Sequence, residues 1–209
     1  MTAGHNRACG ADFARTIPDG TPPGGVSMNA SLQTTLSDYL AAHEVELSPC
    51  SPDDPRHPQP ELHVPEGWVV LPHDVFPHAH TVLVAPEHVV DNWAPNAVLL
   101  HGALSKWRPT DELLEVAGQE ARGLPEWKET FCDTFDFHGH RSVIVRGCYR
   151  VDDVEYTAVT RYLVIDHEYD RYLTQLTATA RSDSLGSLDV HIHTIHESLI
   201  VRQEGRPRE

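Results

Sequence analysis

An antiparallel sheet combined with a few helices, an α+β domain, is the fold class that the sequence predicts. Runs rich in Val, Tyr, Thr and Phe recur between residues 64 and 180 and are separated by Gly, Pro, Asn or Asp, which is the pattern of strands joined by turns. Two other segments, 108–127 and 184–201, carry apolar residues three and four positions apart, which is the helical spacing. These patterns together predict about six to seven strands with helices between them.

The composition limits the kinds of function. The chain has 209 residues, enough for one domain with a core of its own. Its formal net charge of -15 repels phosphate backbones and anionic lipid surfaces. No apolar run approaches the roughly 20 residues that are needed to span a bilayer. We therefore expect neither a nucleic-acid partner nor a membrane span.

Three segments precede the predicted sheet. Residues 1–28 are rich in Gly and Pro and poor in apolar residues, so we expect them to be disordered. Residues 29–47 predict a separate amphipathic helix, whose apolar face holds Leu32, Leu36, Tyr39, Leu40 and His43. Residues 48–62 contain five prolines, which predicts a linker.

The main domain is predicted to span 63–202 and to be followed by a polar tail at 203–209. Strands are expected at 64–71, 81–86, 96–104, 130–137, 141–151, 154–166 and 171–180. The last four follow one another with short polar turns, so we expect them to form consecutive antiparallel pairs. One helix, 108–127, precedes this run and another, 184–201, closes the domain.

The cysteines favour a reducing compartment. Cys9, Cys50, Cys132 and Cys148 form no CxxC pair and no zinc-finger spacing. Cys132 and Cys148 fall on two predicted arms of one hairpin, and the sequence leaves open whether they pair.

A run of histidines near the C-terminus is the candidate metal site. The stretch DVHIHTIHES, residues 189–198, contains His191, His193 and His196. On a helix the first two point about 160° apart and the last two about 60° apart, so a regular helix does not aim all three at one ion. A docked helix with histidines on its polar face is the competing interpretation. Further His-x-His pairs at 78–80 and 138–140 leave a composite site open.

Motifs for catalysis and cofactor binding are absent from the sequence. It contains no GxSxG, no GxxxxGK[ST], no GxGxxG before a helix and no HExxH. The carboxylates of Asp152, Asp153 and Glu155 cluster in a predicted hairpin turn, where a solvated turn is the simpler interpretation. We therefore predict a protein that is not an enzyme and has no cofactor.

Several stretches together carry a resemblance to a known family: VPEGW, PNAVLL before a polar helix that ends in GLPEW, the hairpin FDFHGHRSVIVRGCYRV, TRYLVID, RYLTQLTATA and the terminal helix. Through them, Val64 to Val201 resembles the LpqN/LpqT family of actinobacterial proteins, many of which are mycobacterial envelope lipoproteins. The resemblance implies a PsbP-like α/β sandwich, a curved antiparallel sheet with helices packed on its faces. It also implies a binding or accessory protein, with no catalytic residue to carry over.

One departure from the family concerns its location. An envelope lipoprotein needs an apolar signal segment that ends at the lipidated cysteine, but Cys9 follows GHNRA and Cys50 follows HEVELSP. We therefore expect an unlipidated protein in the cytoplasm.

Three functions are compatible with these observations. The first is a non-catalytic binding or adaptor module that holds a protein segment or an apolar ligand on its sheet face or in a groove. Its candidate contact residues are Trp93 and Trp107, because tryptophans at loop edges often anchor interfaces. The second is a metal-binding protein or metal-dependent enzyme built on the histidines. The third is a cytosolic chaperone or adaptor for a secretion substrate, suggested by the separate N-terminal helix. A homodimer through exposed sheet edges is also possible.

Overall fold

The strand runs predicted from residue 130 onward form a meander of four long strands. In the computed structural model, which describes residues 35–203, they are β6 (Lys128–Phe137), β7 (His140–Val151), β8 (Val154–His167) and β9 (Asp170–Arg181). Each strand pairs antiparallel with the next. Both central residues of the first two turns, His138-Gly139 and Asp152-Asp153, have positive φ, as the type I′ hairpin turn requires.

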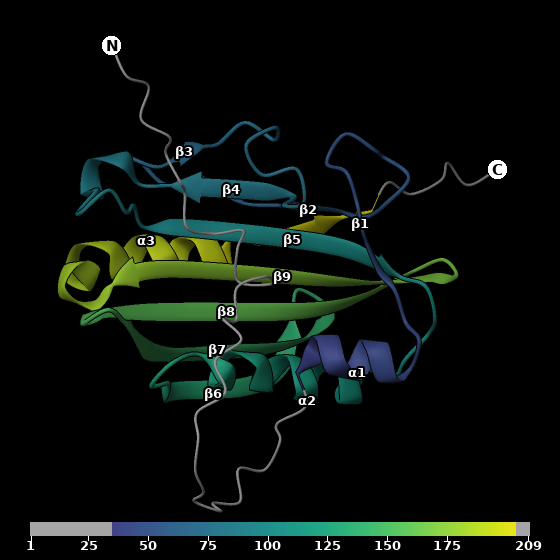
Figure 1. Ribbon diagram of the computed structural model, residues 1–209. Coiled ribbons are helices and arrows are strands. Elements are labelled where there is room, and N and C mark those ends of the chain that lie inside the picture. Colours follow the sequence, from purple (N-terminus) through teal and green to yellow (C-terminus); the bar gives the residue numbers. More distant parts are fainter. Residues whose placement is uncertain (1–34, 204–209) are drawn as a thin grey trace, which may run out of the picture.

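Three shorter strands extend the sheet beyond β9. They are β3 (Val69–Val70), β4 (Thr81–Val84) and β5 (Asn96–Leu104), and the spatial order is β3-β4-β5-β9-β8-β7-β6. Because β5 pairs with β9, it joins the two halves into one antiparallel sheet (Figure 1). The prediction of an α+β domain with about six to seven antiparallel strands is confirmed.

Helices cover both faces of the sheet. On one face, α1 (Leu36–Ala42) and α2 (Thr110–Glu120) bury Leu36, Leu40, Leu113 and Leu114 against residues such as Val145. On the other face, α3 (Leu185–Glu197) buries its leucine and isoleucine stripe against β8 and β9, through Leu188, Ile192 and Ile195. Short 3-10 turns lie at Pro86–His88, Ala121–Gly123 and Ser182–Ser184. The strand alternation explains both cores, since odd and even positions point to opposite faces.

The N-terminal helix differs from the prediction. The described helix covers Leu36–Ala42 rather than 29–47, and Thr35 caps it, with Asp38 completing a capping box. The helix is not separate, because its apolar side packs on α2 and on the sheet. Residues 1–34 and 204–209, which include the predicted disordered segment and most of the predicted tail, lie outside the described residues.

The linker prediction for 48–62 is wrong, because this segment contains paired backbone. Leu47–Pro49 forms β1, which pairs antiparallel with the end of β5. Gln59–Glu61 forms β2, which pairs with β10 (Ile200–Arg202) in a small second sheet. The terminal helix therefore ends at Glu197, before the predicted limit at 201. Prolines hid these strands, since a short edge strand tolerates Pro and shows no periodicity.

Candidate binding face on the sheet

The side of the sheet that carries α1 and α2 is only partly covered. α2 lies over β7 and β8, and α1 packs against α2, so these helices occupy the lower part of the sheet in Figure 1. The hydrophobic cluster that α1 and α2 cover includes one residue of β5, Leu104, and one of β9, Leu173. Both lie toward the same end of the two strands. The remaining residues of this side form what we call the open face: Leu47, Val98, Leu100, Gln175 and Thr177.

Apolar side chains form one row of the open face. Leu100 lies in the middle of β5 with 38% of its surface exposed, and Leu47 of β1 is 40% exposed. Leu47 lies directly over Gly102, where any added Cβ would come within 2.8 Å of its Cδ1 atom. Because Gly102 has no side chain, the side chain of Leu47 has room on this face, where Leu100 is also exposed.

Hydrogen-bonding side chains form the neighbouring row. The amide of Gln175 donates to the hydroxyl of Thr177 at 3.2 Å, and the hydroxyls of Thr177 and Thr160 lie 3.1 Å apart. Gln175 and Leu100 are direct neighbours across β5 and β9. The open face therefore combines apolar contact area with amide and hydroxyl groups.

Aromatic rings border the open face at the start of β5. The ring of Trp93, in the loop before β5, lies edge-on to Tyr156 with 4.9 Å between centroids. Tyr156 stacks on Tyr149 at 5.4 Å, and their register places both tyrosines on the same side of the sheet as Tyr162, which packs under α2. Trp93 is partly buried by this packing.

Trp107 lies beyond the opposite end of β5. It is 66% exposed, and the guanidinium of Arg171 lies 4.7 Å from its ring centroid. Arg171 is itself held by two hydrogen bonds to Asp166 and one to the backbone oxygen of Arg108. The structure therefore places the two predicted contact residues at opposite ends of one face, separated by roughly 30 Å of strand.

A partly buried carboxyl group lies where α2 meets the open face. Tyr162 donates a hydrogen bond to Glu120 at 3.3 Å. Burial raises the pKa of Glu120, and the charge of Asp38 adds to this effect. Burial also raises the pKa of Tyr162 well above its usual range. The hydrogen bond from Tyr162 opposes part of the shift at Glu120, and burial moves the pKa of both groups in the direction of the neutral form.

The three histidines of the candidate metal site diverge. His191 accepts a hydrogen bond from Nε1 of Trp68 at 3.1 Å, His193 is exposed, and His196 is buried with 2% of its surface accessible. Among residues 35–203, no group of three His, Cys, Asp or Glu side chains is placed to hold one metal ion. Of the cysteines, Cys50, Cys132 and Cys148 are free thiols, so the pair left open by the sequence does not form a disulfide.

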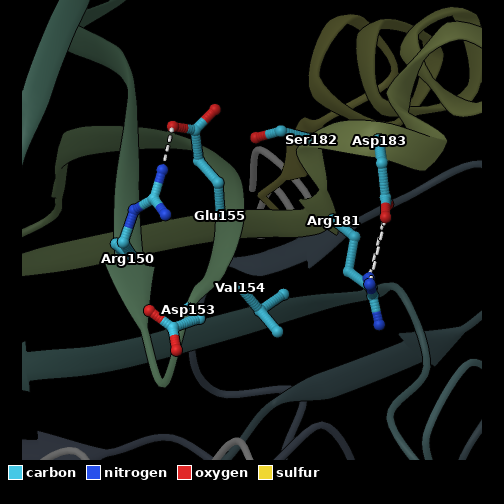
Figure 2. Close-up of a pocket in the computed structure, with 7 residues that line it drawn as sticks. All are labelled: Arg150, Asp153, Val154, Glu155, Arg181, Ser182 and Asp183. Carbon is cyan, nitrogen blue, oxygen red and sulfur yellow. Dashed lines mark hydrogen bonds and ion pairs between the residues drawn. The ribbon is translucent and has the colours of Figure 1, made fainter.

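A polar pocket adjoins the Trp93 end of the sheet. Figure 2 shows its lining, from the β7–β8 turn and the β9–α3 junction: Arg150, Asp153, Val154, Glu155, Arg181, Ser182 and Asp183. Arg150 lies 3.6 Å from Glu155, and Arg181 lies 3.0 Å from Asp183. Each arginine of the pocket thus has a carboxylate partner, and the pocket holds no thiol or imidazole that could act as a nucleophile.

The sequence analysis did not identify the residues of the open face. The stretch NAVLLHGAL is apolar on both sides of the strand, so its pattern does not tell which side a helix will cover. The exposed position of Leu100 follows from where α2 docks, and that is decided by tertiary packing.

A family model and a solved structure of TM-score 0.74 agree with this architecture. The family model described as "Probable lipoprotein LpqN" matches residues 32–202. The crystal structure of LpqN involved in cell envelope biogenesis of Mycobacterium tuberculosis superposes with a TM-score of 0.74 and 22% identity, covering 81% of this chain and 98% of that one. Cyanobacterial PsbP from Synechocystis matches at a TM-score of 0.43, with 12% identity over 85% of this chain and 98% of that one.

Curated relatives are longer proteins. The proline-rich 28 kDa antigen homolog of Mycobacterium leprae is 24% identical over 174 residues, which are 77% of this chain and 56% of that protein. The proline-rich 28 kDa antigen of Mycobacterium tuberculosis is 24% identical over 159 residues, 76% of this chain and 51% of that protein. The chain thus spans about half the length of these relatives. Since the family model covers most of its sequence and the described fold, the chain belongs to the LpqN family.

Proposed function

We propose that this protein is a non-catalytic binding domain that holds a segment of another protein on its open face. The observation that carries the proposal is the row of Leu47 and Leu100, exposed beside the amide of Gln175 and the hydroxyl of Thr177. An exposed apolar row next to hydrogen-bonding groups fits a polypeptide, which offers both apolar side chains and backbone polar groups.

A protein segment is favoured over an apolar small molecule by the shape of the surface. Small apolar ligands bind in concave pockets that bury most of their surface. The pocket in Figure 2 is lined mainly by charged side chains, and the pocket beside Trp68 is lined by Glu66, Gly67, Glu87, His88 and His191. An apolar molecule would leave the charges of either pocket without water, whereas the open face is both apolar and accessible.

An accessory role in cell envelope biogenesis is the proposed context. It rests on family membership and on the involvement of LpqN from Mycobacterium tuberculosis in cell envelope biogenesis. No helix among residues 35–203 is long and apolar enough to cross a membrane. The cytoplasmic location that the sequence predicts stays a prediction. The secretion-chaperone alternative loses its main support, because α1 is part of the domain core.

The experiment that tests the proposal compares two substitutions of exposed residues. Leu100→Glu places a charge in the middle of the open face, and Val190→Glu places the same charge on the outer side of α3, where Val190 is 70% exposed. The full-length chain and both variants are used to capture proteins from a mycobacterial lysate, and captured proteins are quantified by mass spectrometry.

The proposal predicts a protein that is captured by the wild-type chain and by Val190→Glu but is reduced about tenfold or more with Leu100→Glu. Both variants should unfold at the same temperature as the wild type, because both positions are solvent-exposed. Equal capture by all three chains would contradict the proposal.

A further inference from the structure

Three polar side chains are buried together on the α3 face of the sheet. Arg161 of β8 is 1% exposed, Ser142 of β7 is fully buried, and His196 of α3 is 2% exposed. In the sheet register Ile144 pairs with Arg161 and Ser142 with Leu163, so Ser142 and Arg161 are diagonal neighbours on one face. The charge of Arg161 also helps lower the pKa of His196, after burial as the main cause.

Arg161 is held in place by aromatic rings. Its guanidinium carbon lies 3.7 Å from the ring centroid of Phe137 and 5.3 Å from that of Phe135. The guanidinium uses only Nη2, which donates to Oε1 of Glu197 at 2.8 Å. Its Nε and Nη1 atoms have no partner. A planar cation is therefore fixed between two rings with much of its hydrogen-bonding capacity unused.

Buried polar atoms without a hydrogen-bond partner are concentrated around Arg161. By the usual distance and angle criteria, seven buried side-chain nitrogen or oxygen atoms among residues 35–203 lack a hydrogen-bond partner, and five of them belong to Arg161, His196 and Ser142. His196 also has a weaker contact with the backbone of Val159. Each such atom destabilises the folded protein, because the water that it loses on burial is not replaced by another partner. Native proteins seldom leave buried polar atoms unpaired, so this cluster calls for a partner in addition to the side chains around it.

Glu197 is an exchangeable partner for the buried arginine. Its side chain is half exposed, at 50%, while that of Arg161 is 1% exposed, so Glu197 can turn into water while Arg161 cannot. Glu197 is also the last residue of α3, where the helix dipole disfavours a negative charge. An external carboxylate can therefore replace it at small cost.

We propose that Arg161 binds the carboxylate of a small monocarboxylic acid, in exchange for Glu197, with the apolar body of the acid against β6. The guanidinium fork matches a carboxylate in shape and charge, and Ser142 and neutral His196 supply further donors. The apolar body would lie against the rings of Phe135, which is partly buried, and Phe131, which is 50% exposed on the same side of β6. This site lies on the face opposite the open face and is independent of the proposed function.

The test uses hexanoate as the probe and the uncharged hexanol as its matched control. Binding to the full chain is followed through the backbone amide resonances of Ser142 and Phe135 in two-dimensional NMR spectra. Three variants are compared with the wild type. Arg161→Met removes the cation, Glu197→Gln removes the competing carboxylate and keeps its shape, and Arg146→Met removes a partly exposed arginine of the same face, which pairs with Asp189.

The expected result is saturable binding of hexanoate by the wild type and by Arg146→Met, and none of hexanol. Binding should be lost in Arg161→Met and about tenfold tighter in Glu197→Gln. The inference is overturned if Glu197→Gln binds no tighter than the wild type, or if a folded Arg161→Met still binds. It is also overturned if inorganic phosphate binds as tightly as hexanoate. A titration with hexanoate that never saturates would likewise overturn it, and would mean that bridging waters alone satisfy the polar atoms of the cluster.

Discussion

Three histidines are held neutral by burial inside this domain. Burial lowers the pKa of His80 to about 4 and that of His101 to about 3, with smaller contributions from neighbouring histidine charges. Burial likewise lowers the pKa of His196 to about 3. Between these values and the ordinary value of 6.5, the unfolded chain binds more protons than the folded one. The free energy of unfolding should therefore be fully maintained above about pH 6.5 and should fall as the pH drops toward about 3.

His196→Leu is the substitution that tests this effect at one residue. Neither ring nitrogen of His196 has a hydrogen-bond partner of normal geometry, so leucine removes two buried polar atoms and keeps most of the volume. We expect a gain of about 1 kcal/mol in the free energy of unfolding at neutral pH. At about pH 4.5 the gain should be about 3 kcal/mol larger, because the variant has one group fewer that must lose its proton on folding.

The measurement is urea unfolding of both chains across the range from about pH 7 to about pH 4.5. The matched control is His193→Leu, on the same helix but exposed. It should change the pH dependence much less, because it removes only the small contribution of the His193 charge to the pKa of His196. A His196→Leu variant with the same pH dependence as the wild type would show that His196 does not titrate in this way.

For single residues, the sequence identified some candidate contact residues but not the side of the sheet on which each side chain lies. It marked Trp93 and Trp107 as contact residues, and the structure places both beside the open face but at opposite ends. It did not mark Leu100, because Leu99 and Leu100 have the same side chain and differ only in the face to which each points. Which face is covered depends on residues far away in the sequence.

The N-terminal helix shows how an element joins the domain. Leu36 and Leu40 of α1 are buried in one cluster with Leu113 and Leu114 of α2. Tyr39 donates a hydrogen bond of 2.5 Å to Glu112, and Arg108 donates one of 3.0 Å to Tyr39. These contacts tie α1 to α2, so α1 belongs to the folded unit.

Shortening the chain from its N-terminus tests this assignment. A chain that begins at Leu62 lacks α1, β1 and β2, together with buried residues such as Leu36, Leu40 and Cys50. We expect it to lose more than about 5 kcal/mol of stability, since each buried leucine alone contributes about 2–5 kcal/mol, and therefore to be unfolded or close to it. A chain that begins at Leu32 should unfold at the wild-type temperature, as measured by circular dichroism. Equal unfolding temperatures for both shortened chains would contradict the assignment.

Elements with strong local patterns were predicted and elements defined by distant partners were not. β6 to β9 follow from alternating side chains and two-residue turns, which are properties of the local sequence. β1 exists because it pairs with the end of β5, and β2 because it pairs with β10, about 140 residues away. Nothing in the proline-rich stretch that contains them indicates those partners.

Across the whole molecule, the two faces of the sheet carry different chemistry. The face under α3 holds Arg161 among aromatic rings, whereas the open face holds Leu100 between Trp93 at one end and Trp107 at the other. A polypeptide that crosses the open face along β5 would reach both tryptophans, while a short ligand would reach one at most.

Alanine substitutions of the two tryptophans test whether the partner spans the face. Trp93→Ala and Trp107→Ala should each weaken binding of the captured protein by about tenfold, and the double variant by about a hundredfold, because residues this far apart act independently. Trp107→Ala should leave the unfolding temperature nearly unchanged, since Trp107 is 66% exposed. Affinities are measured by isothermal titration calorimetry. A single variant as weak as the double variant would argue for a partner that meets one end only.

The most direct measurement of the central claim is site-specific photo-crosslinking in living mycobacterial cells. A benzophenone side chain is placed at Gln175 on the open face, and in a second chain at Val190, which is exposed on the outer side of α3. If the open face holds a protein segment, light will produce a discrete crosslinked protein from position 175 and none from position 190. The same product from both positions, or no product from position 175, would contradict the account.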